Sequence, residues 1–172
     1  ESFNEIRLLL QHASLRPAPH FLELGCATGE LYRYLHHRRP QFQYSGFDIS
    51  RVAIERARQK YPEGRFSVCG IDLDQIQNQR PRPDILFARD VVHHQPRALD
   101  FLGRLLEIPA EAAILRIRTR DRGKSVLDPE ESCQRHYRRW VPYIVLNTDD
   151  VVETISRMKT VETICIYKHY QV

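Results

Sequence analysis

The chain has 172 residues with a formal net charge of +4, and 42% of its residues are hydrophobic and 28% charged. This length and composition predict a single globular domain over residues 1–172. No apolar run approaches the ~18 residues of a membrane-spanning helix. The opening residues also lack the apolar core of an export signal. We therefore expect a cytoplasmic protein that has no membrane partner.

The four cysteines are separated by 43, 64 and 32 residues; they are Cys26, Cys69, Cys133 and Cys165. This spacing fits no CxxC metal site, so we expect reduced thiols and no metal. Arginine supplies 22 of the 26 basic residues. Guanidinium groups suit carboxylates and phosphates, which leaves anionic substrates and nucleic acid open as partners. The basic residues are interspersed with acids, which favours a solvated surface.

Apolar spacing and capping residues predict helices and strands that alternate along the chain. Thr28, Ser50 and Thr148 are the predicted N-caps. The predicted helices cover residues 3–12, a segment that includes Leu31 and Leu35, and residues 50–61, 96–108 and 148–158. The predicted strands cover residues 20–24, 42–50, 65–72, 83–90 and 112–119, with a final strand or pair of strands over 161–172.

This alternation predicts an α/β fold, with a doubly wound, mostly parallel sheet that carries helices on both faces. Residues 120–147 form the only long segment without a clear pattern. Long loops in compact domains are commonly lids or binding loops, so this segment is a candidate lid over a substrate.

The sequence "FLELGCATGELYRYL" places a glycine-rich bend directly after the first predicted strand. Glycines allow a tight turn and a close approach of the backbone to a ligand, and the next helix would direct its N–H groups at that ligand. A dinucleotide motif G-x-G-x-x-G fails here, because Ala27 and Glu30 occupy the second and third glycine positions. The remaining pattern is E-x-G-x-(G/A)-x-G, formed by Glu23, Gly25, Ala27 and Gly29.

In this motif the chain resembles the class I S-adenosylmethionine-dependent methyltransferases. Ala27 departs from the commonest residue of the family, which is glycine. The resemblance implies a Rossmann-like methyltransferase fold with S-adenosyl-L-methionine as cofactor. It also implies that Glu23 orients the loop and meets the amino group of the ligand. A Glu at the edge of an ordinary strand–helix turn is the alternative.

Two further aspartates extend the resemblance. Asp48 ends the second predicted strand, where a carboxylate can accept both ribose hydroxyls. Ile49 follows it at the position that packs on the adenine in the family. Asp72 matches the residue that accepts the adenine amino group, with Asp74 as an alternative register. The alternatives are a helix-start acid favoured by the macrodipole for Asp48 and a plain turn aspartate for Asp72.

The fourth strand leads into "ARDVVHHQP", which resembles the segment that lines the methionine end of the cofactor in the family. His93 and His94 are candidate general bases because imidazole titrates near neutral pH. The alternative is that one packs against the cofactor while the other caps the loop. The full set of implied cofactor contacts is Glu23, Gly25, Cys26, Ala27, Gly29, Asp48, Ile49, Asp72, Leu73 and Arg89.

These residues predict methyl transfer to a small molecule, which the arginines would suit if it is anionic. An RNA-directed enzyme and a non-catalytic binding module remain as alternatives. The D/N-P-P-Y/F/W motif of nucleic-acid amino methyltransferases is replaced by Ala88-Arg89-Asp90-Val91. The family sheet ends with a seventh, antiparallel strand, for which few residues remain after "VETICIYK", so a sheet without this last strand is among the expectations.

Two arginine-rich segments have open interpretations. Residues 133–143, "CQRHYRRWVPY", could stack bases, recognise an anionic substrate as a lid, or form an amphipathic surface helix, and the helix is favoured. Arg116, Arg118 and Arg120 alternate along the fifth strand and its exit. A central strand should be apolar on both faces, so Arg118 and Arg120 are expected past its end, over the substrate site.

Overall fold

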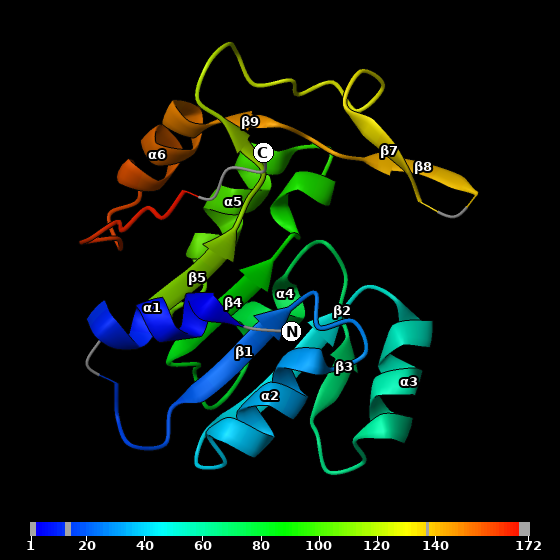
Figure 1. Cartoon of the computed structure of the whole chain (residues 1–172), viewed down its shortest axis with the longest axis vertical. Helices are drawn as coiled ribbons and strands as arrows, with labels where there is room; N and C mark the ends of the chain where they lie inside the picture. Colours follow the sequence, from blue (N-terminus) through cyan, green and yellow to red (C-terminus); the bar gives the residue numbers. More distant parts are fainter. Residues whose placement is uncertain (1–2, 13–14, 137, 169–172) are drawn as a thin grey trace.

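A computed structural model describes residues 3–12, 15–136 and 138–168 of the chain (Figure 1). The α-helices are α1 (Asn4–His12), α2 (Glu30–Arg38), α3 (Arg51–Lys60), α4 (Asp74–Gln77), α5 (Ala98–Leu106) and α6 (Thr148–Ser156), with a 3-10 turn η1 (Val92–His94). The strands are β1 (His20–Leu24), β2 (Gln43–Asp48), β3 (Phe66–Val68), β4 (Ile85–Arg89), β5 (Ala112–Arg116), β6 (Thr119–Arg120), β7 (Cys133–His136), β8 (Arg139–Pro142) and β9 (Leu146–Asn147).

The central sheet has five parallel strands in the order β3-β2-β1-β4-β5. The order reverses between β1 and β4, where the chain crosses from one half of the sheet to the other. In open α/β sheets, ligands bind at the carboxyl ends of the strands beside such a reversal. The predicted doubly wound α/β fold is therefore confirmed, and its switch point lies at the end of β1.

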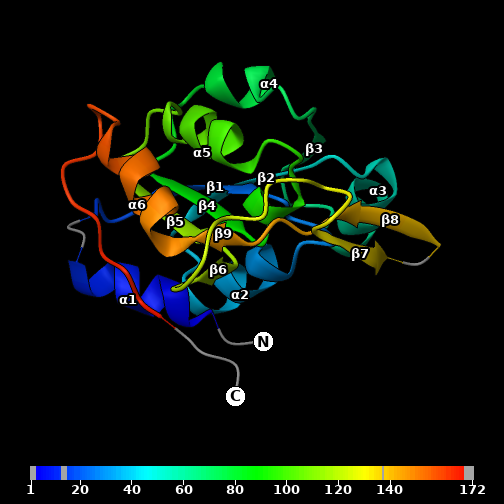
Figure 2. The same ribbon diagram turned by 90° about the horizontal axis from the view of Figure 1, so that it is seen from above.

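Helices cover both faces of this sheet (Figure 2). Neighbouring residues of β1 enter opposite cores: Phe21 packs with α1, α2 and α3, whereas Leu22 packs with α4, α5 and α6. The same alternation holds in β4, where Leu86 and Phe87 lie on opposite faces. Burial on both faces explains why these strands are apolar at nearly every position.

The N-cap residues of the helices agree only in part with those predicted. Ser50 caps α3 as predicted, because its side chain accepts a hydrogen bond from the N–H of Ala53 at 3.2 Å. The prediction for Thr28 was wrong: Gly29 is the N-cap of α2, with φ 85° and no side-chain bond. Asn147, rather than Thr148, caps α6, and its side chain accepts from the Asp149 N–H at 2.7 Å.

The polypeptide that follows β5 departs furthest from the predictions. In the segment 133–143, Cys133–His136 and Arg139–Pro142 pair as the antiparallel hairpin β7–β8 and do not form the amphipathic helix that was favoured, and Figure 1 shows this hairpin projecting from the domain. The predicted strand 112–119 ends at Arg116, so Arg118 and Arg120 lie past its end, as expected. Residues 161–168 contain no strand, which corrects the final-strand prediction as far as it falls on the described residues; 169–172 lie outside them.

Smaller differences concern the third strand. β3 spans only Phe66–Val68 instead of residues 65–72, and the four-residue helix α4, which was not predicted, follows it. Among the described residues, no helix combines the length and the apolar character needed to cross a bilayer.

Candidate functional site

The loop of residues 25–29 leaves the end of β1 and is fixed against β2. The N–H groups of Gly25 and Cys26 both donate to the carbonyl of Phe47, at 2.7 and 3.0 Å. The N–H of Gly29 donates to the Cys26 carbonyl at 2.9 Å. These bonds close the loop into a tight turn in front of α2. The turn presents backbone N–H groups at the start of α2, as a ligand-binding loop would.

Glycine is required at the first position of this loop. Gly25 has φ 79°, and a Cβ at this residue would lie 2.5 Å from Cγ2 of Val91. The residue at position 27 is also left-handed, since Ala27 has φ 45°. An alanine in this region is strained relative to the glycine that is common in the motif. The loop therefore holds a conformation that its own sequence only partly favours.

Asp48 joins the loop to the end of β2. Its Oδ2 accepts from the Ala27 N–H at 2.9 Å, and its Oδ1 accepts from the Ser50 N–H at 2.8 Å. The carboxylate is half-buried. Each carboxylate oxygen can accept a further hydrogen bond, so both oxygens keep the capacity to bind a pair of hydroxyl groups. Ile49, the next residue, is 66% exposed.

Glu23 is the second-last residue of β1 and is buried below the loop. The Tyr44 hydroxyl donates a short hydrogen bond to its carboxylate. Gly46, the register partner of Glu23 on β2, provides the space, because a Cβ there would meet the Tyr44 hydroxyl at 2.7 Å. Burial raises the pKa of Glu23 to about 8, with Tyr44 and Arg89 opposing the rise and Asp48 adding to it. The carboxyl is thus mostly protonated at pH 7.

Asp72 lies in the exposed turn between β3 and α4, four residues past the end of the strand. The charges of Asp48 and Asp72 both add to the burial that raises the pKa of Cys69 to about 11. Similarly, burial raises the pKa of the Cys26 thiol, and the charges of Glu23 and Asp48 raise it further. The ends of β1, β2 and β3 therefore bring Glu23, Asp48 and Asp72 to one edge of the sheet.

Leu73 differs from the other predicted contacts. Its side chain is fully buried and packs in the core with Ile76 rather than at the edge. Its backbone is left-handed, with φ 64°. Only the backbone of Leu73 is therefore well placed to face the edge.

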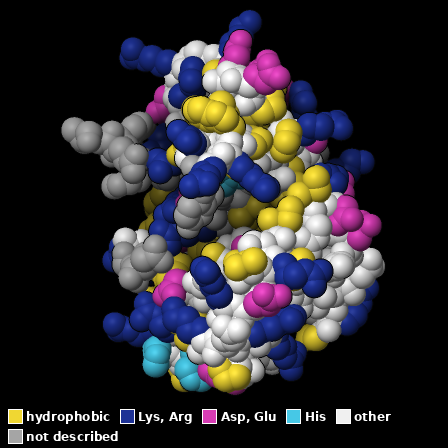
Figure 3. All heavy atoms as spheres, turned by 90° about the vertical axis from the view of Figure 1, so that its right-hand side faces the viewer, with side chains coloured by type: hydrophobic (Ala, Val, Ile, Leu, Met, Phe, Trp, Pro, Cys, Tyr) yellow, Lys and Arg dark blue, Asp and Glu magenta, His cyan; other side chains and the backbone are white. Residues whose placement is uncertain are grey.

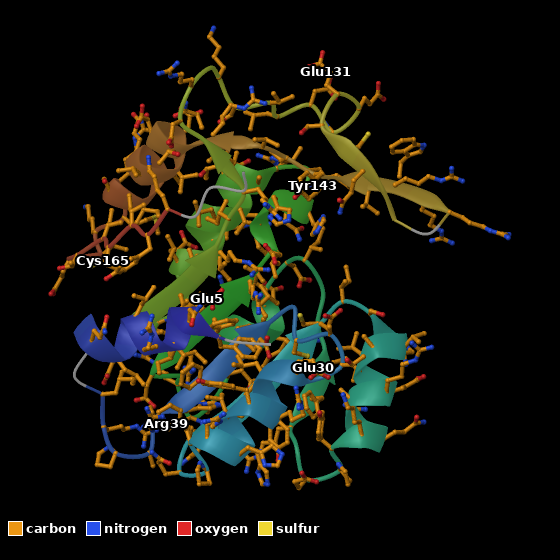
Figure 4. The ribbon with its side chains drawn as sticks, viewed as in Figure 1. Glu5, Glu30, Arg39, Glu131, Tyr143 and Cys165 are labelled. Atoms are coloured by element: carbon orange, nitrogen blue, oxygen red, sulfur yellow. The ribbon has the colours of Figure 1, made fainter. Side chains whose placement is uncertain are left out.

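Arg89 ends β4 and is held by α1. Its guanidinium lies 5.2 Å from the ring centroid of Phe3, and its Nε lies 3.7 Å from a carboxylate oxygen of Glu5. Arg116 forms an ion pair with Asp90, a residue with φ 60°, and its Nη1 lies 3.7 Å from Glu5. Figure 4 shows Glu5 on α1, and its carboxylate lies near side chains of both β4 and β5. This network of charges fixes the end of β4 beside the loop.

His93 and His94 lie in η1, immediately past the end of β4. Their ring centroids are 4.4 Å apart, and the Tyr143 ring lies 4.9 Å from His93 and 5.8 Å from His94. Burial, with smaller contributions from the charges of His94 and Arg118, lowers the pKa of His93 to about 4. His93 is therefore neutral at pH 7. Arg118, past the end of β5, is close enough to affect it.

The base of the β7–β8 hairpin is bonded to these histidines. The Nδ1 of His94 lies 2.9 Å from the Pro142 carbonyl, and the Ile144 N–H donates to the His93 carbonyl at 2.7 Å. A carbonyl only accepts, so His94 carries its proton on Nδ1 and leaves the Nε2 lone pair available when neutral. Figure 4 shows Tyr143 at this junction. The segment 120–147 thus reaches η1, past the carboxyl end of β4.

Sequence reasoning missed Tyr44, Val91 and Tyr143. Alternation along β2 places Tyr44 and Gly46 on the same face as Glu23, so a strand-pairing argument could have found the buried contact. Val91 could have been found from its position after β4. Tyr143 is about fifty positions from the histidines in the sequence, and no local pattern links it to them. Within the described ranges, no cluster of three His, Cys, Asp or Glu side chains could hold a metal ion.

The fold and this edge define the class of the protein. A parallel sheet with its switch point at a glycine loop, an acid at the end of the next strand and a buried acid below the loop is the arrangement of a class I S-adenosylmethionine-dependent methyltransferase. The family model described as "Methyltransferase domain" matches residues 22–112, just over half of the chain. The chain belongs to this family.

Curated relatives match between 45% and 66% of the chain. A trans-aconitate 2-methyltransferase of Variovorax paradoxus is 28% identical over 113 residues, which are 66% of this chain and 43% of that protein. A malonyl-[acyl-carrier protein] O-methyltransferase of Anoxybacillus flavithermus is 26% identical over 81 residues, 45% of this chain and 31% of that protein. The aligned part of the chain spans less than half of the length of these relatives.

Solved structures support the fold. A TehB-like S-adenosylmethionine-dependent methyltransferase from Corynebacterium glutamicum is 21% identical and has a TM-score of 0.54. The match covers 91% of this chain and 72% of that structure. At this identity the likeness concerns the arrangement of the backbone, and it extends over most of the elements in Figure 1.

Proposed function

We propose that the chain binds S-adenosyl-L-methionine at the carboxyl edge of β1, β2 and β3 and methylates a small anionic molecule. The observation that carries the proposal is the convergence of Glu23, Asp48 and Asp72 on the edge beside the loop of residues 25–29. The carboxylates of Asp48 and Asp72 suit a ligand that carries a positive sulfonium and a positive amino group, and Glu23, mostly protonated at pH 7, would still accept a hydrogen bond from that amino group. When bound, this cofactor supplies an activated methyl group on sulfur.

The residues present fit the parts of that cofactor. Asp48 would accept the ribose hydroxyls, and the exposed Ile49 would pack on the adenine. Asp72 would accept the adenine amino group, with the Leu73 backbone beside it. Gly25, Cys26, Ala27 and Gly29 would line the methionine end, because Gly25 leaves no Cβ in the way. Glu23 and Arg89 would hold that end from below.

The acceptor would lie above η1, between the strand ends and the base of the β7–β8 hairpin. His93, His94 and Tyr143 form one wall there. Arg118 adds positive charge beside His93, which favours an anionic acceptor. A carboxylate is already ionised and needs no base; the trans-aconitate and malonyl-[acyl-carrier protein] enzymes named above are consistent with an acceptor of this kind.

The two histidines would have different roles. His93 is buried and neutral, so it would pack against the acceptor and hold the position of His94. The Nε2 of His94 could take a proton from a hydroxyl acceptor, because the Pro142 carbonyl holds the proton on Nδ1. Most of the rate would come from alignment of the acceptor and exclusion of water.

The cofactor assignment is tested by calorimetric titration with S-adenosylhomocysteine. We expect Asp48→Ala to weaken binding at least tenfold, or ~1.4 kcal/mol, because both ribose contacts are lost. Asp100→Ala removes an exposed carboxylate from α5 and is the matched control. Unchanged affinity in Asp48→Ala would reject the role of Asp48.

The acceptor assignment is tested by turnover with a panel of di- and tricarboxylates and of hydroxyl-bearing analogues. We expect His94→Gln to lower turnover with hydroxyl acceptors and to leave S-adenosylhomocysteine affinity unchanged. With carboxylate acceptors the loss should be small. Equal turnover of His93→Gln, His94→Gln and the unmodified protein on every acceptor would remove both histidines from the mechanism.

RNA-directed methylation is the second candidate, because the β7–β8 hairpin exposes aromatic and basic side chains. Trp140 is 70% exposed, and Arg135, Arg138 and Arg139 are exposed on the same hairpin. Exposed aromatics stack on bases, and arginines bind phosphates. RNA binding that weakens steeply with salt, together with methyl incorporation into RNA, would favour this candidate. Cofactor binding without turnover on any acceptor would favour a non-catalytic module.

A further inference from the structure

A hollow lies at the β3 edge of the sheet, away from the loop of residues 25–29. It has a volume of about 550 Å³ and is bounded by the beginnings of β1 and β3, the middle of β2, α3 and the loop before β4. A volume of a few hundred Å³ is the usual size of a small-molecule site. We call this region the β3-edge hollow; its polar walls are His20, Ser45, Arg58, Arg65, Ser67 and Arg80, together with Gln79.

The hollow exists because the crossover from β3 to β4 is poorly filled. Helices α2, α3 and α5 have nine or ten residues each, whereas α4 has four. Beyond α4, the chain runs as a loop through Gln79, Arg80 and Pro81 until it enters β4. One short helix cannot cover the face of β2 and β3 as the longer helices cover theirs. The uncovered part of that face forms the floor of the hollow.

The charge of the hollow is one-sided. Among the described residues that line it, Arg58, Arg65 and Arg80 are basic and none is Asp or Glu. The Nε and Nη2 of Arg58 donate to the Phe66 carbonyl at 3.0 and 2.6 Å, so this guanidinium is held in place. Guanidinium groups that share one cavity repel one another unless an anion lies between them.

The floor of the hollow carries polar groups that are buried. His20 is 4% and Ser45 is 8% exposed, and Nε2 of His20 lies 2.9 Å from Oγ of Ser45. Burial lowers the pKa of His20, and the charge of Arg65 lowers it further. Asp84, the acid whose charge acts on His20, is bonded to Arg16 and to the His20 N–H, and it does not line the hollow. Because the two groups share this hydrogen bond, one donor is left for an anion: the Ser45 hydroxyl if Nε2 of His20 donates, or Nδ1–H of His20 if Nε2 accepts.

We propose that the β3-edge hollow binds a small oxyanion, either a phosphate monoester or a di- or tricarboxylate, at a site separate from the cofactor edge. Arg65 and Arg80 supply charge from the rim, Arg58 supplies a fixed guanidinium, and His20 with Ser45 contacts the ligand from the floor. The inference does not depend on methyl transfer, because none of these residues belongs to the edge described above.

The test uses the whole chain with inorganic phosphate and citrate as probes, at constant ionic strength, by calorimetry and thermal unfolding. The variant Arg65→Gln/Arg80→Gln removes two rim charges from exposed positions. The control Arg56→Gln/Arg157→Gln removes the same number of charges from exposed sites, one on α3 and one directly after α6. We expect at least one probe to bind at millimolar concentration or below, and the rim variant to bind it about tenfold more weakly, ~1.4 kcal/mol, while the control is unchanged.

The comparison of the two probes identifies the chemistry: preference for phosphate indicates a phosphate monoester, and preference for citrate indicates a polycarboxylate. If neither phosphate nor citrate binds, the proposal is overturned. Equal weakening in the rim variant and in the control also overturns it, because the effect would then be one of net charge. A loss of S-adenosylhomocysteine affinity in the rim variant alone would contradict the separation of the two sites.

Discussion

The cofactor edge and the segment after β5 meet at η1, but they are built in different ways. At the edge, Gly25, Cys26 and Ala27 bond to β2 residues about twenty positions away, and each contact joins neighbouring parallel strands. After β5, the chain forms two small sheets, each made of two paired strands of two to four residues. Trp140 on the hairpin is 70% exposed. The family model covers residues 22–112 and stops before this segment. In the function proposed above, binding of the cofactor would rest on the regular sheet, and selection of an acceptor would rest on the segment after β5.

The two regions also meet on the surface of the molecule. Figure 3 shows the side from which the hairpin projects, with basic side chains spread over both the upper and the lower part and a hollowed surface between them. If the two regions have separate roles, substitutions at the edge should change cofactor binding, and substitutions in the segment should change turnover. Four substitutions test this division, in order of the effect expected.

Gly25→Ala should have the largest effect. The added Cβ would lie 2.5 Å from Val91, at a residue with φ 79°, so the loop must move. We expect about a hundredfold loss of S-adenosylhomocysteine affinity, ~2.7 kcal/mol, measured by calorimetry. Gly103→Ala is the control, because a Cβ there meets nothing within 4 Å and favours helix α5. A loss smaller than threefold in Gly25→Ala would show that the loop does not hold the ligand.

Glu23→Gln should change how stability depends on pH. The pKa of Glu23 is raised to about 8 in the folded protein, whereas an unfolded glutamate titrates near 4.3. The protonated form therefore stabilises the fold, and this contribution is full below pH ~4.3 and falls as pH rises toward 8. Glu23→Gln should remove more than ~1.4 kcal/mol of that decline between pH 5 and 8, since one pKa unit is worth that amount. Denaturant unfolding at several pH values measures it, and parallel curves for the two proteins would refute it.

Ser132→Ala tests the attachment of the hairpin. The Ser132 hydroxyl donates to the Tyr143 carbonyl at 2.6 Å, and the Tyr143 N–H donates to the Ser132 carbonyl. Loss of one such bond costs about 1 kcal/mol, so turnover should fall about fivefold while S-adenosylhomocysteine affinity stays the same. Ser156→Ala, at the exposed end of α6, should change neither quantity. A change in cofactor affinity alone would break the division between the two regions.

Trp140→Ala should have the smallest effect on the fold. Because the side chain is 70% exposed, the free energy of unfolding should change by less than ~0.5 kcal/mol. Chemical denaturation measures this change. Steady-state kinetics on the preferred acceptor then sharpen the comparison: a raised KM would assign the hairpin to acceptor binding. A large loss of stability would instead show that the hairpin is part of the core.

The two regions also differ in how well the sequence predicted them. Strands β1, β2 and β4 were found because both of their faces are largely buried, whereas the less buried β3 and β5 end before their predicted ends. The glycine loop and Asp48 were found because their spacing follows from the connection of neighbouring strands. The position of Leu73 in the core was not predicted, because a left-handed residue in a turn leaves no pattern. The hairpin was interpreted as a helix because alternating Arg and aromatic residues fit both periods, and its pairing depends on residues with no strong turn signal.

Contacts between distant segments account for the remaining differences. Tyr143 reaches His93 and His94 only after the chain has passed through α5, β5 and the hairpin. The contact of Arg89 with Phe3 and Glu5 similarly joins β4 to α1, which are far apart in the sequence. Such contacts follow from the assembled layers and not from local propensity. The candidate cofactor residues could therefore be proposed from sequence, and the acceptor wall required the structure.

Ile49 and Ile71 leave aliphatic surface open to solvent at the cofactor edge, with 66% and 54% of their area exposed. Water around such groups contributes a positive heat capacity. A planar aromatic ligand that covers them would release this water, so association should be accompanied by a negative heat-capacity change.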